Sequence, residues 1–254
     1  GQSISTGSLF ESAMVKNGID YLSLGGAANM PYSIANRRIE LHGPDIPMPV
    51  LWWRSVSSTH NAFVMESFID EIAHVNHKDP LELRQTLLTN QPRHLQVLEL
   101  AAQKAGWGKP LKKGRALGIA MHACFGSYVA QVAEVSITNN NEVKVHRVVC
   151  AVDCGIAVNP LNIKAQIEGA IIFGLSAALY GEITLTDGKV QQSNFHDYPV
   201  LRMNAMPTVE VHIVKSDEQP TGIGEPGVPP IAPAVTNALF KLTGRRVRKL
   251  PVRL

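Results

Sequence analysis

The sequence predicts an α+β fold in which mixed β-sheets pack against helices. Residues 61–76 carry apolar side chains at helical spacing, residues 128–152 alternate apolar and polar side chains around one turn, and residues 160–180 return to helical spacing. The chain of 254 residues is long enough for one large domain or two modest ones. We expect two subdomains, a helix-rich one over residues 1–115 and a second over residues 116–254.

The helix over residues 61–76 is predicted from a single apolar stripe. Its members are Phe63, Met65, Phe68, Ile69, Ile72 and Val75. Because such a stripe normally faces the core, we expect the acidic Glu66, Asp70 and Glu71 to lie on the opposite side of the helix.

A second helix is predicted to begin at Asp79 and Pro80, since aspartate is a favoured N-cap and proline is favoured in the first turn. We expect this helix to reach about Leu88. A third helix over about residues 93–105 ends at Gly106, a residue type that commonly follows the last helical turn.

The pattern changes to the two-residue period of strands after Gly114. Residues 128–138 and 143–152 alternate on either side of the polar stretch "NNNE". Alternation on both sides of turn-forming residues predicts a β-hairpin.

Another helix is predicted to begin at Asn159 and Pro160 and to run to about Tyr180. Two short strands then flank an Asp-Gly turn, and a further strand, "TVEVHIV", leads into the stretch "GIGEPGVPP". A last helix over residues 231–243 is stopped by Gly244.

Bulk composition excludes several classes of protein. With 45% hydrophobic and 18% charged residues and a net charge of +3, the chain is typical of an ordered globular protein. The best apolar segment, "GAIIFGLSAALYG", is too short to cross a bilayer, so no transmembrane segment is predicted. The basic tail "GRRVRKLPVRL" lacks interleaved aromatics, so we expect it to be solvated or to face another subunit and expect no nucleic-acid partner.

Three cysteines, Cys124, Cys150 and Cys154, form no C-x-x-C pair and no disulfide framework. Cys150 and Cys154 could ligate a metal with His146, but their positions favour packed, reduced thiols, and no protein metal site is predicted. The first 20 residues lack an initiating Met and a signal-peptide pattern, so we expect a fragment of a longer protein. Localisation stays open between cytoplasm and periplasm.

A carboxylate lies in an unusual place at Glu225, between Gly224 and Pro226 in a stiff turn that leads into an apolar helix. Glycine permits close approach to the backbone and proline restricts the direction of the side chain, as a general base requires. A helix-capping role fits the same position, and spacing alone does not decide between them. Adjacent His196 and Asp197 are expected to point to opposite faces of a strand and not to act as a pair.

Five stretches, in this order, resemble the large subunit of the molybdenum hydroxylases, the xanthine dehydrogenase and aldehyde oxidase family, in its branch of the isoquinoline 1-oxidoreductase β-subunit type. They are "WWRSVSSTHNAFVMESFIDEIA", "AVDCGIAVNP", "AQIEGAIIFGLSAALYGEI", "SNFHDYPVLRM" and "GIGEPGVPPIAPAVTNALF". The resemblance implies an α+β molybdopterin-binding domain of an oxidoreductase. Such an enzyme hydroxylates an N-heteroaromatic or oxidises an aldehyde with water as the oxygen source.

The resemblance also implies roles for individual residues. In this family a pterin dithiolene holds molybdenum, and the glutamate of a G-E-P motif deprotonates a water-derived oxygen that attacks an electron-poor carbon. Glu225 occupies that catalytic position. The cofactor-binding residues implied are Trp53, Arg54 and Ser55 of the loop before the first long helix, Gln166 of "AQIEG" and Gly224.

The chain departs from the family pattern because it lacks a G-Q-G segment and further pterin-contacting loops. We therefore expect the C-terminal part of a longer subunit, inactive alone, whose partners are its own N-terminal part and a small [2Fe–2S] subunit. The pterin form, with or without a cytosine dinucleotide, is left open. The alternative is a non-catalytic structural or assembly fragment with the same fold.

Overall fold

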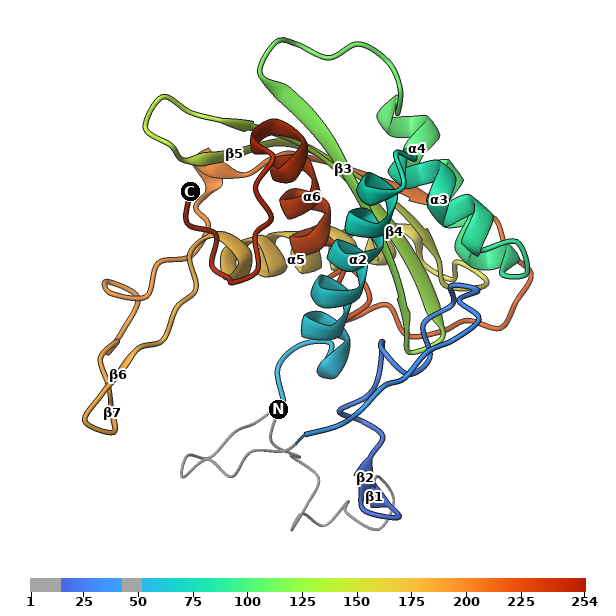
Figure 1. The fold of residues 1–254 in the computed structure, drawn as a ribbon, viewed down its shortest axis with the longest axis horizontal. Coiled ribbons are helices and arrows are strands. Elements are labelled where there is room, and N and C mark those ends of the chain that lie inside the picture. The colour runs from blue at the N-terminus through green and yellow to red at the C-terminus, as the bar shows by residue number, and fades with distance from the viewer. Residues whose placement is uncertain (1–14, 43–51) are drawn as a thin grey trace.

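The computed structural model describes residues 15–42 and 52–254, so the interpretation of the first 14 residues lies outside it (Figure 1). The helices are α2 (Ser57–Val75), α3 (Pro80–Leu87), α4 (Pro92–Ala105), α5 (Pro160–Leu179), the short η1 (Met203–Ala205) and α6 (Ile231–Thr243). The strands are β1 (Val15–Lys16), β2 (Ile19–Asp20), β3 (Arg115–Cys124), β4 (Ser127–Ile137), β5 (Val143–Asp153), β6 (Leu185–Thr186), β7 (Lys189–Val190) and β8 (Thr208–Ile213).

A four-stranded sheet in the order β3-β4-β5-β8 forms the centre of the molecule. The first three strands are antiparallel, whereas β8 pairs parallel to β5 after the crossover through α5. One core cluster joins α5 and α6 to one face of this sheet, and a second cluster joins α2, α3 and α4 to the other. The sheet is thus mixed and covered by helices on both faces, which confirms the predicted α+β class (Figure 1).

Helix starts and ends follow local sequence signals. The Asp79 side chain accepts hydrogen bonds from the first-turn backbone of α3, and Asn159 caps α5 in the same way. Gly106 and Gly244 end α4 and α6 in the left-handed conformation. The β4–β5 hairpin and the short β6–β7 ribbon, which projects from the body in Figure 1, also lie where the sequence predicts them.

Strand β3 was missed by the sequence pattern. Seven consecutive residues of this strand, from Ala116 to His122, are buried, because α6 packs on one face and α4 with α2 on the other. A strand that is covered on both faces shows no alternation of apolar and polar residues.

The predicted orientation of α2 is wrong for part of its length. Glu66 and Asp70, expected on the outer side, are 2% and 5% exposed, whereas Phe68 and Val75, expected in the core, are 53% and 73% exposed. The reason is electrostatic, because arginines from other elements meet the buried carboxylates inside the molecule.

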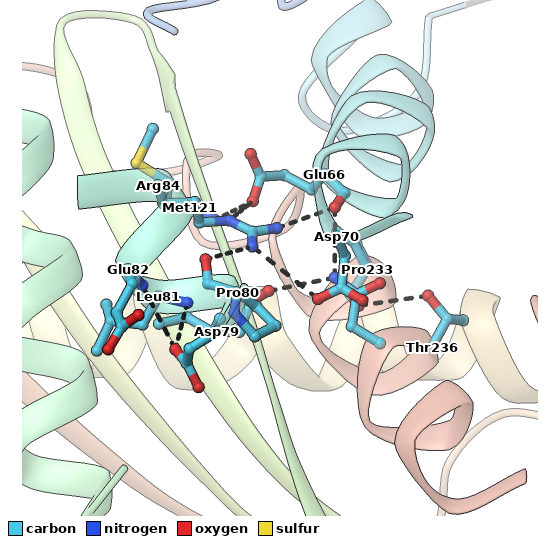
Figure 2. Close-up of polar contacts among 12 residues, drawn as sticks. Glu66, Asp70, Asp79, Pro80, Leu81, Glu82, Arg84, Met121, Pro233 and Thr236 are labelled. Atoms are coloured by element: carbon cyan, nitrogen blue, oxygen red, sulfur yellow. Dashed lines mark hydrogen bonds and ion pairs between the residues drawn. The ribbon is translucent and has the colours of Figure 1, made fainter. Parts of the chain in front are cut away.

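Arg84 of α3 is the centre of this buried polar network (Figure 2). Its Nε donates to Glu66 Oε2 at 3.0 Å, and its other nitrogens donate to the carbonyls of Glu66 and Pro80. The same Oε2 accepts the backbone N–H of Met121 in β3 at 3.0 Å, and Oε1 accepts the hydroxyl of Tyr32 at 2.5 Å. One carboxylate therefore joins α2 to α3, to β3 and to the segment before α2.

The basic C-terminal tail folds back onto the domain. Arg246 pairs with buried Asp70 at 2.7 Å, and Arg253 pairs with Glu182 at 3.0 Å. The expectation of a solvated or subunit-facing tail is therefore wrong for Arg246, whose side chain is 12% exposed, whereas the Arg253 side chain remains 61% exposed. The division of the chain near residue 115 stays a prediction.

We expect Arg84→Met to destabilise the fold by about 3–5 kcal/mol, because it leaves the Glu66 carboxylate buried without its cation. The double variant Glu66→Gln/Arg84→Met should be less destabilised than Arg84→Met alone. Urea unfolding measures both. Arg248→Met, which breaks the more exposed pair with Glu71, is the control and should cost less than about 1 kcal/mol. Equal costs for the two single variants would contradict the network.

Candidate active site

The loop before α2 adopts a strained backbone. Ser55 and Val56 have φ values of 72° and 51°, although neither is glycine. For a β-branched residue such as valine this conformation is a genuine outlier, at a cost of about 1–3 kcal/mol, and such outliers concentrate at functional sites. In this conformation the Ser55 backbone N–H donates a hydrogen bond to the Glu225 carboxylate.

Glu225 is anchored by that loop at three points. The Ser55 N–H donates to Glu225 Oε1 at 3.0 Å, and the Ser55 hydroxyl donates to the Glu225 carbonyl at 2.8 Å. Arg54 donates through Nε and Nη2 to the carbonyl of Gly224, at 2.8 Å for Nε. Both the backbone and one carboxylate oxygen of Glu225 are therefore fixed, while Oε2 accepts no hydrogen bond from any described residue.

Helix α5 supplies the next wall of the site. Gln166 Oε1 accepts a hydrogen bond from Arg54 at 3.3 Å, which turns the amide nitrogen of Gln166 away from Arg54. Phe173, two turns further along α5, stacks on Trp53 with ring centroids 4.5 Å apart and lies 5.6 Å from the Arg54 guanidinium carbon.

The turn after Glu225 packs directly on α5. A Cβ at Gly227 would lie 2.8 Å from the Cβ of Ala170 and 3.1 Å from Ile167, so no larger residue fits there without movement. The Gly227 carbonyl accepts a hydrogen bond from buried Gln131 of β4 at 2.7 Å. The Glu225 turn is thus held between the sheet and α5.

The electrostatics of the site combine one cation with one carboxylate. Burial lowers the pKa of Arg54, and the negative charge of Glu225 opposes that shift. The Glu225 carboxylate also lies beside the N-terminal end of α2, where the helix dipole favours negative charge. The arrangement can orient a carboxylate as a proton acceptor next to a positively charged guanidinium group.

The start of β4 contacts the segment that precedes Glu225. The Ser127 hydroxyl contacts the Thr221 hydroxyl at 2.8 Å and donates to the Gly222 carbonyl at 2.7 Å. Cys124 lies at this end of β3, where burial raises the pKa of its thiol to about 12, against a hydrogen bond with Ser58 that lowers it, and the charge of Glu225 raises it further. Cys124 therefore carries a neutral thiol.

All six residues singled out by sequence come together at one place. Arg54, Ser55, Gln166, Gly224 and Glu225 are joined by hydrogen bonds, and Trp53 is 41% exposed beside Phe173. Their functional roles stay predictions.

Sequence reasoning missed two members of the site. Phe173 follows Gln166 by seven residues on one helix, a spacing that places both on the same face and could have revealed it. Cys124 had no such signal, because strand β3 was not recognised.

The other residues considered from the sequence, the His196–Asp197 pair and two cysteines, form no hydrogen bond with the Glu225 site among the described residues. His196 Nε2 and Asp197 Oδ2 lie 3.5 Å apart in an exposed turn, so the expectation that they point apart on a strand is wrong. Cys150 and Cys154 are buried free thiols. Among residues 15–42 and 52–254, no group of three His, Cys, Asp or Glu side chains could hold a metal ion, and no helix is long and apolar enough to cross a membrane.

A family model described as a molybdopterin cofactor-binding domain matches residues 77–207, just over half of the chain. The chain belongs to this family. The resemblance to the large subunits of molybdenum hydroxylases is thereby confirmed. The match includes Gln166, while Arg54 and Glu225 lie on either side of it.

Three curated relatives are similar to this molybdopterin-binding domain. The beta subunit of isoquinoline 1-oxidoreductase from Brevundimonas diminuta is 37% identical over 87% of the chain and 29% of its own length. A membrane-bound aldehyde dehydrogenase of Gluconacetobacter polyoxogenes is 34% identical over 80% of the chain and 29% of its length. A nicotinate dehydrogenase subunit of Pseudomonas putida is 31% identical over 87% of the chain and 20% of its own length. The chain thus spans less than a third of each relative.

Solved structures support the fold. The aldehyde oxidoreductase of Desulfovibrio desulfuricans aligns with a TM-score of 0.63 and 14% identity over 79% of this chain and 40% of that one. The aldehyde oxidoreductase of Desulfovibrio gigas aligns with a TM-score of 0.63 and 13% identity over 78% of this chain and 40% of that one. These likenesses establish the molybdopterin-binding fold of the aldehyde oxidoreductase type.

We expect the domain to lose stability as the pH falls from about 6.5 toward 4. Burial lowers the pKa of His94 and of His122 to about 4, below the ordinary value of about 6.5. The unfolded chain therefore binds protons in this window that the folded chain does not, and unfolding is favoured as the pH falls. Urea midpoints at pH 7 and pH 4.5 measure the difference.

The variant His122→Gln should show a smaller fall in midpoint between these two pH values, because glutamine does not titrate. His196→Gln, at an exposed position, should fall as the unaltered protein does. An identical fall in all three proteins would show that His122 is not buried in its neutral form.

Proposed function

We propose that the chain is the molybdopterin-binding part of an oxidoreductase that hydroxylates an N-heteroaromatic compound or oxidises an aldehyde. The relatives named for isoquinoline, nicotinate and aldehydes support these two substrate classes. The observation that carries the proposal is the hydrogen bond from the Ser55 N–H to Glu225 Oε1, because it directs a carboxylate whose other oxygen is free.

The reaction adds the oxygen of water to the substrate. An electron-poor C–H carbon or an aldehyde carbon gains a C–O bond, and two protons and two electrons are released. When bound, the molybdenum–pterin cofactor supplies the redox chemistry and accepts the two electrons. A partner subunit of the [2Fe–2S] type would serve as the acceptor of these electrons.

Glu225 acts as the general base in this proposal. Its Oε2 accepts a proton from the water-derived oxygen as that oxygen attacks the substrate. Ser55 keeps Oε1 in place, so the carboxylate does not rotate when Oε2 becomes protonated. Arg54 supplies a positive charge beside the anionic cofactor and carboxylate.

The residues fit a pterin-held metal. The described residues offer a polar wall of Arg54, Gln166 and backbone groups but no cluster of protein metal ligands, as a metal held by pterin sulfurs requires. The amide nitrogen of Gln166 and the guanidinium of Arg54 would donate hydrogen bonds to the cofactor. Trp53 and Phe173 would exclude water from its edge.

The active complex requires more than this chain. Since the chain spans less than a third of its relatives, we propose that the remainder of the large subunit completes the cofactor site. The 254 residues alone should keep the fold without turnover.

We expect Glu225→Gln to lower kcat/KM by about 10²–10⁴-fold in the cofactor-loaded complex, because the amide cannot accept the proton. Molybdenum and pterin content should equal that of the unaltered complex, as measured by metal analysis. Glu168→Gln, at an exposed position on α5, is the control and should keep full turnover. Unchanged turnover in Glu225→Gln, or no molybdenum in the unaltered complex, would overturn the proposal.

We expect Gln166→Leu to lower pterin retention about tenfold, because a hydrogen-bonding amide is replaced by an apolar group of similar size. Pterin content after extended dialysis measures this loss. The matched control is Gln191→Leu on the surface near the β6–β7 ribbon. Equal pterin content in both variants would remove Gln166 from the cofactor site.

A further inference from the structure

A polar side chain lies in the middle of the face of β4 that packs toward α5 and α6. Val129 and Ala133 belong to the core cluster on this face, and Gln131 lies between them at the same two-residue spacing. Gln131 is 0% exposed. Its cross-strand neighbours, Ala120 in β3 and Cys150 in β5, are small and leave room for an amide. A fully buried amide on an apolar face calls for a specific partner.

The partner of Gln131 is the backbone of the Glu225 turn. The amide nitrogen of Gln131 donates to the Gly227 carbonyl at 2.7 Å. This contact decides the orientation of the amide, because a carbonyl oxygen only accepts hydrogen bonds. Gln131 Oε1 is buried and accepts no hydrogen bond from any described residue. Since an unpaired buried oxygen is unfavourable, the amide adds little net stability, and its main effect is on the position of the turn.

The turn is stiff enough to transmit a displacement of Gly227 to Glu225. The Val228 N–H donates to the Glu225 carbonyl at 2.9 Å, which closes a four-residue turn, and Pro226 restricts the backbone at its second position. The Ser55 hydroxyl donates to the same carbonyl at 2.8 Å. Gly227 and Glu225 therefore belong to one hydrogen-bonded unit, and a shift of one moves the other.

The contact with α5 limits this turn in a different way. A Cβ at Gly227 would lie 2.8 Å from the Cβ of Ala170, so the turn cannot move closer to the helix. Packing of this kind resists approach but not separation, whereas a hydrogen bond fixes a distance in both directions. Among the described residues, the donor that holds the Gly227 carbonyl is Gln131.

We infer that Gln131 is a positioning residue for the proposed reaction. Through the Gly227 carbonyl it fixes the turn, and it thereby keeps the Glu225 carboxylate within reach of the Ser55 N–H. Because Gln131 is fully buried, it acts through Glu225 and not by contact with substrate or cofactor. The inference rests on the proposed function, in which Glu225 is the base, and deepens it.

Amide hydrogen exchange in the purified full chain tests this contact without the cofactor. Gln131→Met keeps the length of the side chain and removes the donor. The Val228 amide, which bonds to the Glu225 carbonyl, should then exchange about tenfold faster, because the turn opens more often. The control Trp107→Phe loses a hydrogen bond from Nε1 to Asp79 at 3.1 Å and should leave Val228 unchanged. Unchanged Val228 exchange in Gln131→Met would overturn the inference.

Turnover in the cofactor-loaded complex tests the consequence. Gln131→Met should lower kcat about tenfold and leave KM and molybdenum content unchanged, because the base is displaced while the binding groups are not. In a Glu225→Gln background the same substitution should lower kcat by less than about twofold, since Gln131 acts through the Glu225 carboxylate. Trp107→Phe should keep kcat. A loss in the Glu225→Gln background as large as in the unaltered one would contradict the positioning role.

Gln131→Glu shows whether the donated hydrogen bond is responsible. Burial raises the pKa of a carboxyl group, so the protonated acid can still donate to the Gly227 carbonyl. At pH 6 this variant should keep kcat within about threefold of the unaltered complex. A kcat as low as that of Gln131→Met would exclude the bond as the cause. Failure of Gln131→Met to fold would leave Gln131 a structural role only and would also overturn the inference.

Failure of this inference and failure of the proposed function give different results. Lost turnover in Glu225→Gln together with an unchanged kcat in Gln131→Met would remove the positioning role and keep the proposed function. Full turnover in Glu225→Gln would overturn the proposed function and the positioning role with it, even if Val228 exchanges faster in Gln131→Met.

Discussion

The Glu66 carboxylate is the constraint on which the rest of the molecule depends. It lies on α2 and receives hydrogen bonds from α3, from β3 and from the segment that precedes α2. Asn237 of α6 approaches the same point through the Glu66 carbonyl at 3.4 Å. Since a buried carboxylate without these partners would be very costly, α2 has only one acceptable rotation and depth against the sheet. The Arg54–Ser55 loop enters this helix, so its position follows from that of Glu66.

This rigidity explains how a strained loop can persist. Two successive non-glycine residues with positive φ would relax in an isolated peptide, but here both ends of the loop are fixed. Helix α2 holds one end, and Arg54 and Ser55 bond the other side to the backbone of Gly224 and Glu225. The loop conformation directs the Ser55 N–H to one carboxylate oxygen of Glu225. A carboxylate held in this way would need no rearrangement to accept a proton in the proposed reaction.

How much could be read from sequence varies with the kind of signal. Local signals such as the Asp79 cap, the Gly106 stop and the β4–β5 alternation were sufficient, because each depends on nearby residues only. The orientation of α2 was misread, since an arginine 18 residues away decides that Glu66 is inside. For the site, the motifs indicated Glu225 and Arg54, but the contact of Arg54 with the Glu225 turn spans 170 residues and depends on packing. The unpaired nitrogen of His122 leaves no trace in the sequence at all.

Charged and uncharged groups occupy different parts of this region. On the side of α5, Arg54 and Glu225 form a charged region that suits an anionic cofactor and a proton acceptor. In β3, burial lowers the pKa of His122 to about 4, so this imidazole is uncharged at neutral pH. Cys124, the last residue of β3, is also uncharged because burial raises the pKa of its thiol to about 12. The charged groups available for reaction are therefore Arg54 and Glu225, while His122 and Cys124 stay uncharged.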